Sequence, residues 1–303
     1  MYSSILQLDY IISKNKNNLS ENLNFKKILK KTGIKETFKA DTNEDVLNLA
    51  EKLCKKNHHY IKGSDCLIFV TQTPRYLLPS CSCILQDKLE LPKTLMTFDI
   101  NMGCSGFIYS LAVANSLISN NTCKKITIIC SDTYNSFFDV KNRNRLLFSD
   151  AASLCVIGQS KIKKIGKFIF NTDGSGYDDI IIKENIKKRL EFQMNGSNVY
   201  SFTLDVIPKL IQDYFNLNNT SSKNYNKVIF HQASKLILES LRDKLKFPKE
   251  KFLIDLKFGN TTSSTIPITL KRSIKSRKIK KGENILLCGF GVGLSCGVTS
   301  IKL

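Results

Sequence analysis

The 303-residue sequence contains no tryptophan, only three histidines and only six prolines. No apolar run approaches the roughly 18 residues that a membrane-spanning helix requires, so none is predicted. Asp9 interrupts the short apolar run near the N-terminus, and no basic segment precedes that run, which argues against a signal peptide. No Cys-x-x-Cys pair or Cys/His metal spacing occurs, so no metal site is expected.

The chain has ten cysteines, and most of them lie inside apolar runs such as Ile128-Ile129-Cys130 and Leu286-Leu287-Cys288. In such runs a cysteine packs as a small buried hydrophobe. The closest pair, Cys81 and Cys83, lacks partner cysteines at a metal-binding spacing. We therefore expect a reducing, cytoplasmic environment.

Positive charge dominates, because 46 lysines and arginines stand against 26 acidic residues, for a net charge of +20. A basic surface attracts acidic partners, such as nucleic acid, an anionic membrane or an acidic carrier protein. The alternative is compositional bias, because lysine, asparagine and isoleucine are abundant throughout. The densest basic cluster, residues 271–281, lacks the interleaved aromatic residues of single-strand binding surfaces, and we expect a solvated helix end and turn there.

The chain exceeds the usual length of one domain, and its 42% hydrophobic content excludes a disordered protein. An internal repeat is present: residues 99–104 recur as residues 255–260, and residues 228–232 resemble residues 67–71. In the first pair, each copy is an apolar run that ends in glycine and a chemically distinctive side chain. A duplicated α/β unit would bring three such side chains to related strand ends: Cys104, His231 and Asn260.

Strand and helix patterns alternate through both halves of the chain. The expected strands are 66–71, 97–101, 126–130, 152–157, 168–170, 227–230, 252–257, 284–287 and a last strand that ends at Leu303. The expected helices are 41–57, 80–89, 105–119, 201–215, 233–245 and 262–275. Because each strand is a continuous apolar run, we predict sheets covered on both faces, in an α/β fold of five layers, α/β/α/β/α. The predicted halves are residues 1–160, with the cysteine, and 161–303, with the histidine and asparagine.

Cys104 is the sharpest candidate for chemistry. It lies in Gly103-Cys104-Ser105-Gly106, between a predicted strand and an apolar predicted helix. The partial positive charge of a helix N-terminus stabilises a thiolate, so we expect a thiol pKa lowered toward neutrality. The flanking glycines permit a sharp turn and a close approach of substrate.

His231 ends an apolar strand, and the other two histidines, His58 and His59, lie in a polar segment where solvent exposure is expected. A buried histidine with a structural hydrogen bond is the ordinary interpretation, but His231 is the only credible base for Cys104. Asn260 could serve as a helix cap, which is a frequent role of asparagine. Its place in the repeat favours a second role, an amide donor beside the thiol.

These side chains allow a specific mechanism, in which the thiolate attacks a thioester and holds the acyl group. Backbone N–H groups of Cys104 and of the Gly291-Val292-Gly293 turn would stabilise the oxyanion. A second substrate then loses CO2, and neutral donors such as His231 and Asn260 suit the resulting enolate. A cysteine protease also uses Cys, His and Asn, but not usually in a duplicated α/β architecture.

The sequence resembles the thiolase-fold condensing enzymes, specifically the β-ketoacyl-acyl carrier protein synthase III family, from about Lys31 to the C-terminus. Nine motifs stand in the family's order. They are Lys31-Thr32-Gly33-Ile34, Leu77-Leu78-Pro79-Ser80, Phe98-Asp99-Ile100-Asn101-Met102-Gly103-Cys104-Ser105-Gly106-Phe107, Leu147-Phe148-Ser149-Asp150-Ala151-Ala152, Asp173-Gly174-Ser175-Gly176, Met194-Asn195-Gly196, His231-Gln232-Ala233-Ser234, Gly259-Asn260-Thr261 and Gly289-Phe290-Gly291-Val292-Gly293.

The resemblance implies that Cys104 is the acylated nucleophile and that His231 and Asn260 assist decarboxylation and bind the enolate oxygen. It implies that Leu78 borders the acyl pocket across a homodimer interface. It also implies an acyl carrier protein as partner and no metal or redox cofactor, with acyl-coenzyme A or acyl-carrier phosphopantetheine as substrate.

Several positions depart from the family pattern. Lys27 stands where the family stacks a tryptophan on the coenzyme A adenine, and Lys31 replaces an arginine. Lys235 lies next to the place of a coenzyme-contacting arginine, and Arg143 or Arg145 fills the position of a phosphate-binding arginine. Arginine and lysine are not interchangeable in stacked or bidentate contacts, so the choice between coenzyme A and a carrier-bound arm stays open.

The sequence is compatible with three functions. The favoured one is decarboxylative condensation with malonyl-acyl carrier protein, in fatty-acid or specialised-metabolite synthesis. An acyltransferase that moves the acyl group to an alcohol or amine is the alternative, and retention of both His231 and Asn260 favours condensation. A non-catalytic or nucleic-acid-binding protein would leave Cys104, His231 and Asn260 unexplained, so no nucleic-acid partner is expected.

Overall fold

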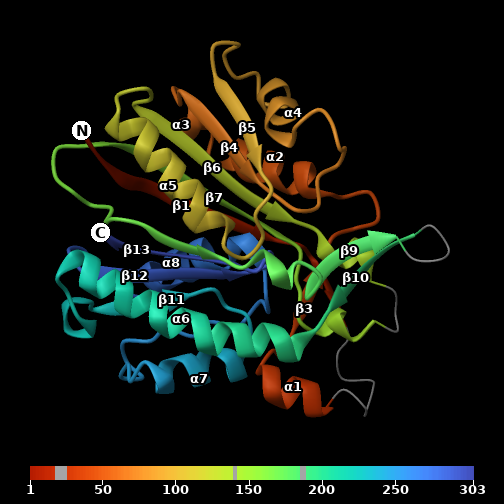
Figure 1. Cartoon of the computed structure of the whole chain (residues 1–303). Coiled ribbons are helices and arrows are strands. Elements are labelled where there is room, and N and C mark those ends of the chain that lie inside the picture. Colours follow the sequence, from red (N-terminus) through yellow and green to blue (C-terminus); the bar gives the residue numbers. More distant parts are fainter. Residues whose placement is uncertain (18–25, 139–141, 185–188) are drawn as a thin grey trace.

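The structure, a computed structural model, describes residues 1–17, 26–138, 142–184 and 189–303, and of residues 26–28 only the backbone. Two larger sheets form its framework (Figure 1). The five-stranded sheet has the order β1 (Tyr2–Ile12), β7 (Ala151–Ser160), β6 (Lys125–Asp132), β4 (Cys66–Val70) and β5 (Met96–Ile100). The four-stranded sheet has the order β11 (Lys227–Phe230), β12 (Asn284–Gly291), β13 (Ser295–Lys302) and β8 (Ile169–Thr172).

The two sheets repeat one topology. Strand β4 runs parallel to β6 in the first sheet, as β11 runs parallel to β12 in the second. Each sheet then continues through two antiparallel pairings, β6–β7–β1 in the first and β12–β13–β8 in the second. The internal repeat of the sequence therefore corresponds to a repeated order of strands.

One predicted strand is absent from this order. The prediction of a strand over 252–257 is wrong, because the segment makes only an isolated bridge between Val228 and Phe252. Beyond that bridge, the side-chain amide of Gln232 replaces a neighbouring strand, since its Oε1 accepts from the backbone N–H of Asp255 at 2.7 Å and its Nε2 donates to the Leu253 carbonyl at 3.4 Å. The segment still occupies the place that β5 has in the other sheet.

Helices cover both faces of each sheet, which gives the predicted five layers. The outer helices on the first sheet are α2 (Val46–Lys56) and α4 (Cys81–Lys88). The middle layer holds α5 (Gly106–Ser119) and α8 (Thr265–Lys275), and the outer helices on the second sheet are α6 (Gly196–Asn218) and α7 (Lys235–Lys244). The predicted α/β/α/β/α fold is confirmed (Figure 1).

Smaller elements complete the described chain. Two short helices, α1 (Lys26–Thr32) and α3 (His58–Ile61), join the layers. Two small sheets pair β2 (Asn15–Asn17) with β3 (Thr37–Lys39) and β9 (Ile180–Glu184) with β10 (Leu190–Met194). His58 and His59 are exposed in α3, as predicted.

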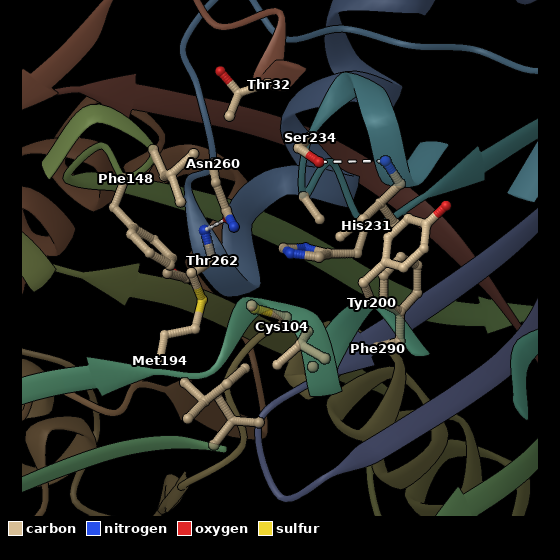
Figure 2. A pocket seen from close by; sticks show the side chains of 18 of the residues that line it. Thr32, Cys104, Phe148, Met194, Tyr200, His231, Ser234, Asn260, Thr262 and Phe290 are labelled. Carbon is tan, nitrogen blue, oxygen red and sulfur yellow. Dashed lines mark hydrogen bonds between the residues drawn. The ribbon is translucent and has the colours of Figure 1, made fainter. Parts of the chain in front are cut away.

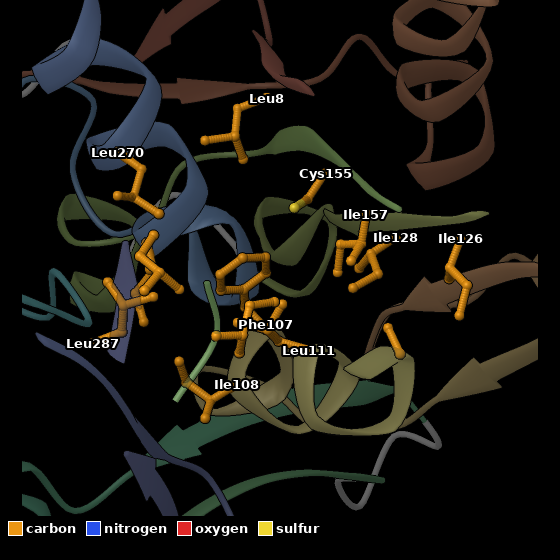
Figure 3. Close-up of a cluster of buried hydrophobic side chains, with 14 of the residues drawn as sticks. Leu8, Phe107, Ile108, Leu111, Ile126, Ile128, Cys155, Ile157, Leu270 and Leu287 are labelled. Carbon is orange, nitrogen blue, oxygen red and sulfur yellow. The ribbon is translucent and has the colours of Figure 1, made fainter. Parts of the chain in front are cut away.

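Helix α5 is central because it is apolar around most of its circumference. Its residues Phe107, Ile108 and Leu111 are fully buried between the two sheets (Figure 3). The same cluster includes Leu270 of α8 and Leu287 of β12, so the two halves share one hydrophobic core. A helix that contacts a sheet on each side needs apolar residues on both of these faces, not on a single stripe.

Helix boundaries differ modestly from those predicted. The helix expected over 41–57 begins only at Val46, because Asp45 caps it by accepting hydrogen bonds from the backbone of Leu47 and Asn48. The basic cluster 271–281 forms the end of α8 and an exposed turn, as expected, although Ile279 is buried. Among the described helices, none has the length and apolar character needed to cross a membrane.

Candidate active site

Cys104 lies in the short turn between β5 and α5. The turn is closed by a hydrogen bond from the backbone N–H of Gly106 to the carbonyl of Gly103 at 2.8 Å. The hydroxyl of Ser105 lies 2.7 Å from that of Ser295, which in turn donates to the carbonyl of Val292 at 2.7 Å. These contacts attach the cysteine turn to the loop between β12 and β13.

Two glycines allow the loop to approach the cysteine closely. A Cβ atom at Gly289 would lie 2.9 Å from the Cα of Ser105, and one at Gly291 would lie 2.7 Å from the Cβ of Cys104. Only a residue without a side chain fits at either position. The approach brings the backbone N–H groups of Val292 and of Cys104 itself to the sulfur, where both favour the thiolate.

The expectation of a lowered thiol pKa is wrong. Burial raises the pKa of Cys104 to about 12, and the negative charge of Asp132 adds to the rise, while the two backbone N–H groups only oppose it. Desolvation therefore has a larger effect on the thiol pKa than the N-terminus of α5 has. The thiol is therefore protonated at neutral pH.

His231 follows β11, and its backbone N–H extends the ladder by donating to the Cys288 carbonyl at 2.8 Å. Its ring is buried, lies edge-on to Phe290 at 5.5 Å, and places Nδ1 2.7 Å from the hydroxyl of Thr265. Burial lowers the pKa of His231 to about 3. The imidazole is therefore neutral at physiological pH.

Asn260 is fixed by its own backbone and side chain. Its N–H donates to the Leu147 carbonyl at 2.8 Å, and its carbonyl accepts from Ser149 at 2.9 Å. Its Oδ1 accepts from the backbone N–H of Thr262 at 2.8 Å. Since the oxygen faces Thr262, the amide Nδ2 is the part of the side chain left to donate. Gly259 before it has φ of 66°, and a Cβ there would lie 2.8 Å from the Leu147 carbonyl.

The three side chains line one cavity of about 440 Å³ (Figure 2). Large apolar or aromatic side chains line much of it: Tyr134, Leu147, Phe148, Ile180, Phe192, Met194, Val199, Leu236, Ile237, Phe290 and Val292. Hydroxyl side chains come from Thr32, Ser197, Tyr200, Ser201, Ser234 and Thr262. No Lys, Arg, Asp or Glu of the described chain lines the cavity.

The residues that the resemblance assigns to substrate binding lie outside this lining. Lys31 and Lys235 are exposed, but each is adjacent in sequence to a residue that lines the cavity. Arg143 is exposed and Arg145 is half-buried in the short helix before Leu147. Two further positions are Lys27, whose side chain lies outside the described residues, and Leu78, which is 81% exposed.

Sequence reasoning missed three residues that support the site: Asp132, Thr262 and Thr265. Asp132 ends the buried strand β6 and accepts hydrogen bonds from Thr262 and Ser263. An acidic residue at the end of an apolar strand, Ile128-Ile129-Cys130-Ser131-Asp132, was the available signal. All ten cysteines are free, and among the described residues no group of three or more His, Cys, Asp or Glu side chains could hold a metal ion.

Comparisons with known proteins point to one family. The family profile described as 3-Oxoacyl-[acyl-carrier-protein (ACP)] synthase III matches residues 98–174, and the profile of its C terminal part matches residues 215–303. A Beta-ketoacyl-[acyl-carrier-protein] synthase III of Fusobacterium nucleatum is 35% identical, over 94% of both chains.

Solved structures show the same similarity. One crystal structure of a 3-oxoacyl-(acyl-carrier-protein) synthase III superposes with a TM-score of 0.93 at 27% identity, covering 100% of both chains. The structure of the Aquifex aeolicus 3-oxoacyl-[acyl-carrier-protein] synthase III gives a TM-score of 0.89 at 27% identity, covering 99% of this chain and 100% of that one.

Proposed function

The chain belongs to the 3-oxoacyl-[acyl-carrier-protein] synthase III family, and on that premise we propose that it condenses an acyl group held on Cys104 with malonyl-acyl carrier protein. The reaction is a decarboxylative Claisen condensation that yields a β-ketoacyl-acyl carrier protein, so the enzyme is an acyltransferase. The observation that carries the proposal is the convergence of a thiol, a neutral imidazole and a carboxamide on one cavity without charged lining residues in the described chain.

The first half-reaction transfers an acyl group to Cys104. The thiol proton passes to Nε2 of His231 as the sulfur attacks the thioester carbonyl of the donor. The backbone N–H groups of Cys104 and Val292 bind the oxyanion that forms. When this intermediate collapses, the departing thiol of the donor takes the proton from His231, and the imidazole is neutral again.

The second half-reaction forms the carbon–carbon bond. The malonyl carboxylate enters a cavity where no described cation pairs with it, which favours its loss as CO2. The electrons of the broken bond enter the thioester as an enolate, whose oxygen accepts hydrogen bonds from His231 and Asn260. The enolate carbon attacks the acyl group on Cys104, and the released thiolate takes one proton from solvent. These steps balance without a redox or metal cofactor.

The hydroxyl of Thr265 lets His231 accept a proton in the first half-reaction and donate a hydrogen bond in the second. Its hydroxyl lies 2.7 Å from Nδ1 of His231 and 3.1 Å from the carbonyl of Thr262, and a hydroxyl donates only one proton. When it donates to Thr262, Nδ1 carries the ring proton and Nε2 can accept the thiol proton. When it donates to Nδ1, Nε2 carries the proton and can donate to the enolate.

The cavity mouth suits a phosphopantetheine arm. The cavity lining includes Thr32 of α1 and Leu236 and Ile237 of α7, next in sequence to the exposed lysines Lys31 and Lys235. These cations and Arg143 and Arg145 are suited to the phosphates of coenzyme A or of a carrier-bound arm. The net charge of +20 further favours an acidic carrier protein as partner.

A homodimer accounts for two exposed leucines. Leu77 and Leu78 are 99% and 81% exposed, and large apolar side chains exposed to this extent mark contact surfaces. A hollow of about 270 Å³ that includes Gln72 and Asn101 shares the wall residues Tyr134, Ile180, Phe192 and Val292 with the catalytic cavity. Leu78 of the partner subunit would fill this hollow and border the part of the cavity that holds the acyl group.

Ten free cysteines favour the cytoplasm as the location.

Intact-mass spectrometry tests the first half-reaction. The protein, incubated with a panel of acyl-coenzyme A and acyl-carrier donors, is expected to gain one acyl group, and Cys104→Ala is expected to gain none. A wild type that no donor labels would overturn the covalent mechanism. Acyl transfer to an alcohol or amine is not favoured, because the curated relatives are named for condensation.

A further inference from the structure

Asp132 is a buried carboxylate that neither half-reaction uses directly. It ends β6 and is 2% exposed. Its Oδ1 accepts from the backbone N–H of Gln72 at 2.8 Å and from the hydroxyl of Thr71 at 3.2 Å. Its Oδ2 accepts from the hydroxyls of Thr262 at 2.6 Å and Ser263 at 2.9 Å. One carboxylate therefore joins the strand ends of the first half to the loop that follows Asn260.

Thr262 holds an unfavourable backbone conformation at this junction. Its φ is 52°, which is the left-handed region, and a β-branched residue rarely adopts it. Such a conformation persists only where surrounding contacts over-determine it. The short hydrogen bond from the Thr262 hydroxyl to Asp132 is one such contact.

Thr262 also contacts one of the proposed enolate donors, Asn260. Its N–H donates to Oδ1 of Asn260 at 2.8 Å (Figure 2), which leaves the amide Nδ2 as the part of the side chain that can donate. Its carbonyl lies 3.1 Å from the hydroxyl of Thr265, but that hydroxyl donates to Nδ1 of His231 in the second half-reaction. The orientation of Asn260 therefore depends on the backbone of one strained residue.

We propose that Asp132 is a positioning residue for decarboxylation, which acts by holding Thr262 so that the amide of Asn260 faces the enolate oxygen. This role rests on the proposed function, because it concerns the second half-reaction. It assigns no contact with substrate to Asp132 itself.

The two half-reactions depend on Asp132 differently. The cysteine turn is held by Ser105, Ser295 and Gly291, and none of these contacts involves Asp132. The negative charge of Asp132 raises the pKa of the Cys104 thiol, so a neutral replacement does not disfavour the thiolate. Acylation should therefore survive a change that disturbs the amide of Asn260.

The test compares both half-reactions in Asp132→Asn, read as acyl adduct by intact mass and as CO2 released from malonyl-acyl carrier protein. Acylation is expected within about threefold of wild type, and CO2 release is expected to fall about 10²-fold, as for small displacements of catalytic groups. Asp150→Asn is the matched control, because Asp150 is a buried carboxylate that accepts from Ala40 and Asn135. It should change stability without separating the two half-reactions.

A second pair of variants decides the question if Asp132→Asn does not fold. Thr262→Val keeps the β-branched shape and loses the hydroxyl, whereas Thr262→Ser keeps the hydroxyl. Decarboxylation is expected to fall in the valine variant and to be retained in the serine variant. Equal rates in the two would overturn the positioning role, as would CO2 release unchanged in Asp132→Asn. A wild type that releases no CO2 would instead overturn the proposed function, and the positioning role with it.

Discussion

A Cβ atom placed on Gly291 would lie 2.7 Å from the Cβ of Cys104 and 3.0 Å from its sulfur. Cys104 is therefore packed directly against the bare backbone at the end of β12. This contact brings the N–H of Val292 to the sulfur.

Gly291→Ala should push the loop away from the sulfur and weaken the oxyanion site. We expect acylation of Cys104 to slow by about tenfold or more, since overpacking of this kind costs about 1–3 kcal/mol. Rapid-quench intact mass measures the rate. Gly174→Ala is the control, because a Cβ there meets no atom within 4 Å, and an equal effect of both substitutions would contradict the steric explanation.

Asn260→Ala should separate the two half-reactions. The variant keeps Cys104, Val292 and His231, so the acyl adduct should form at a rate near that of wild type. Loss of one enolate donor should reduce CO2 release from malonyl-acyl carrier protein by about 10²–10³-fold. The alanine also removes the acceptor of the Thr262 N–H, so Asn260→Asp, which keeps an acceptor oxygen but no amide donor, is the companion variant. Full decarboxylation in both would remove Asn260 from the mechanism.

Thr265→Val should impair both half-reactions, because Nδ1 of His231 loses its only side-chain partner among those described. The expected loss is about tenfold in each, in line with about 1–1.5 kcal/mol for one hydrogen bond. Thr265→Ser retains the hydroxyl and should keep activity close to wild type. Serine and valine variants with the same kinetics would argue against a role for the hydroxyl.

Much of the site was predictable from local sequence, because glycines and strand ends are local signals. The Gly103-Cys104-Ser105-Gly106 turn and the apolar character of α5 placed Cys104 at the centre of the molecule. The depth of burial was not predictable, so the direction of the thiol pKa shift was wrong. Asp132 and Thr262 are 130 residues apart and come into contact only in the folded protein. The sequence around Asp132 therefore does not indicate its hydrogen-bond partners.

The failed strand over 252–257 has a similar cause. Its apolar pattern matches that of β5, but the amide of Gln232 takes the hydrogen bonds that a strand would need. A side chain that competes for backbone groups is invisible to a periodicity argument.

The stability of the protein should depend on pH through His231. Burial lowers its folded pKa to about 3, below its ordinary value of 6.5. Below pH 6.5 the unfolded chain binds a proton at His231 that the folded chain does not bind. The contribution of His231 to the free energy of unfolding is therefore fully present above pH 6.5 and is lost as the pH drops toward 3. The slope approaches about 1.4 kcal/mol per pH unit for one proton. Urea midpoints of wild type and His231→Gln, measured from pH 7 to pH 4.5, should converge on acidification; parallel curves would contradict a buried neutral imidazole.

Leu78→Glu should weaken the proposed homodimer, because it places a charge in the contact. Light scattering after size exclusion should then show a shift from dimer to monomer. Ile162→Glu is the control, since Ile162 is also largely exposed but lies in the turn after β7. A monomeric wild type, or a dimer unaffected by Leu78→Glu, would contradict the assignment of this surface.

The most direct measurement follows two quantities in one reaction. Acyl-loaded wild-type enzyme, freed of donor, is mixed with malonyl-acyl carrier protein labelled in its free carboxyl group. Condensation on Cys104 predicts one labelled CO2 released for each acyl group lost from the enzyme, with the acyl group recovered in a β-ketoacyl-acyl carrier protein. Discharge of the acyl group to water, an alcohol or an amine without release of labelled CO2 would contradict it.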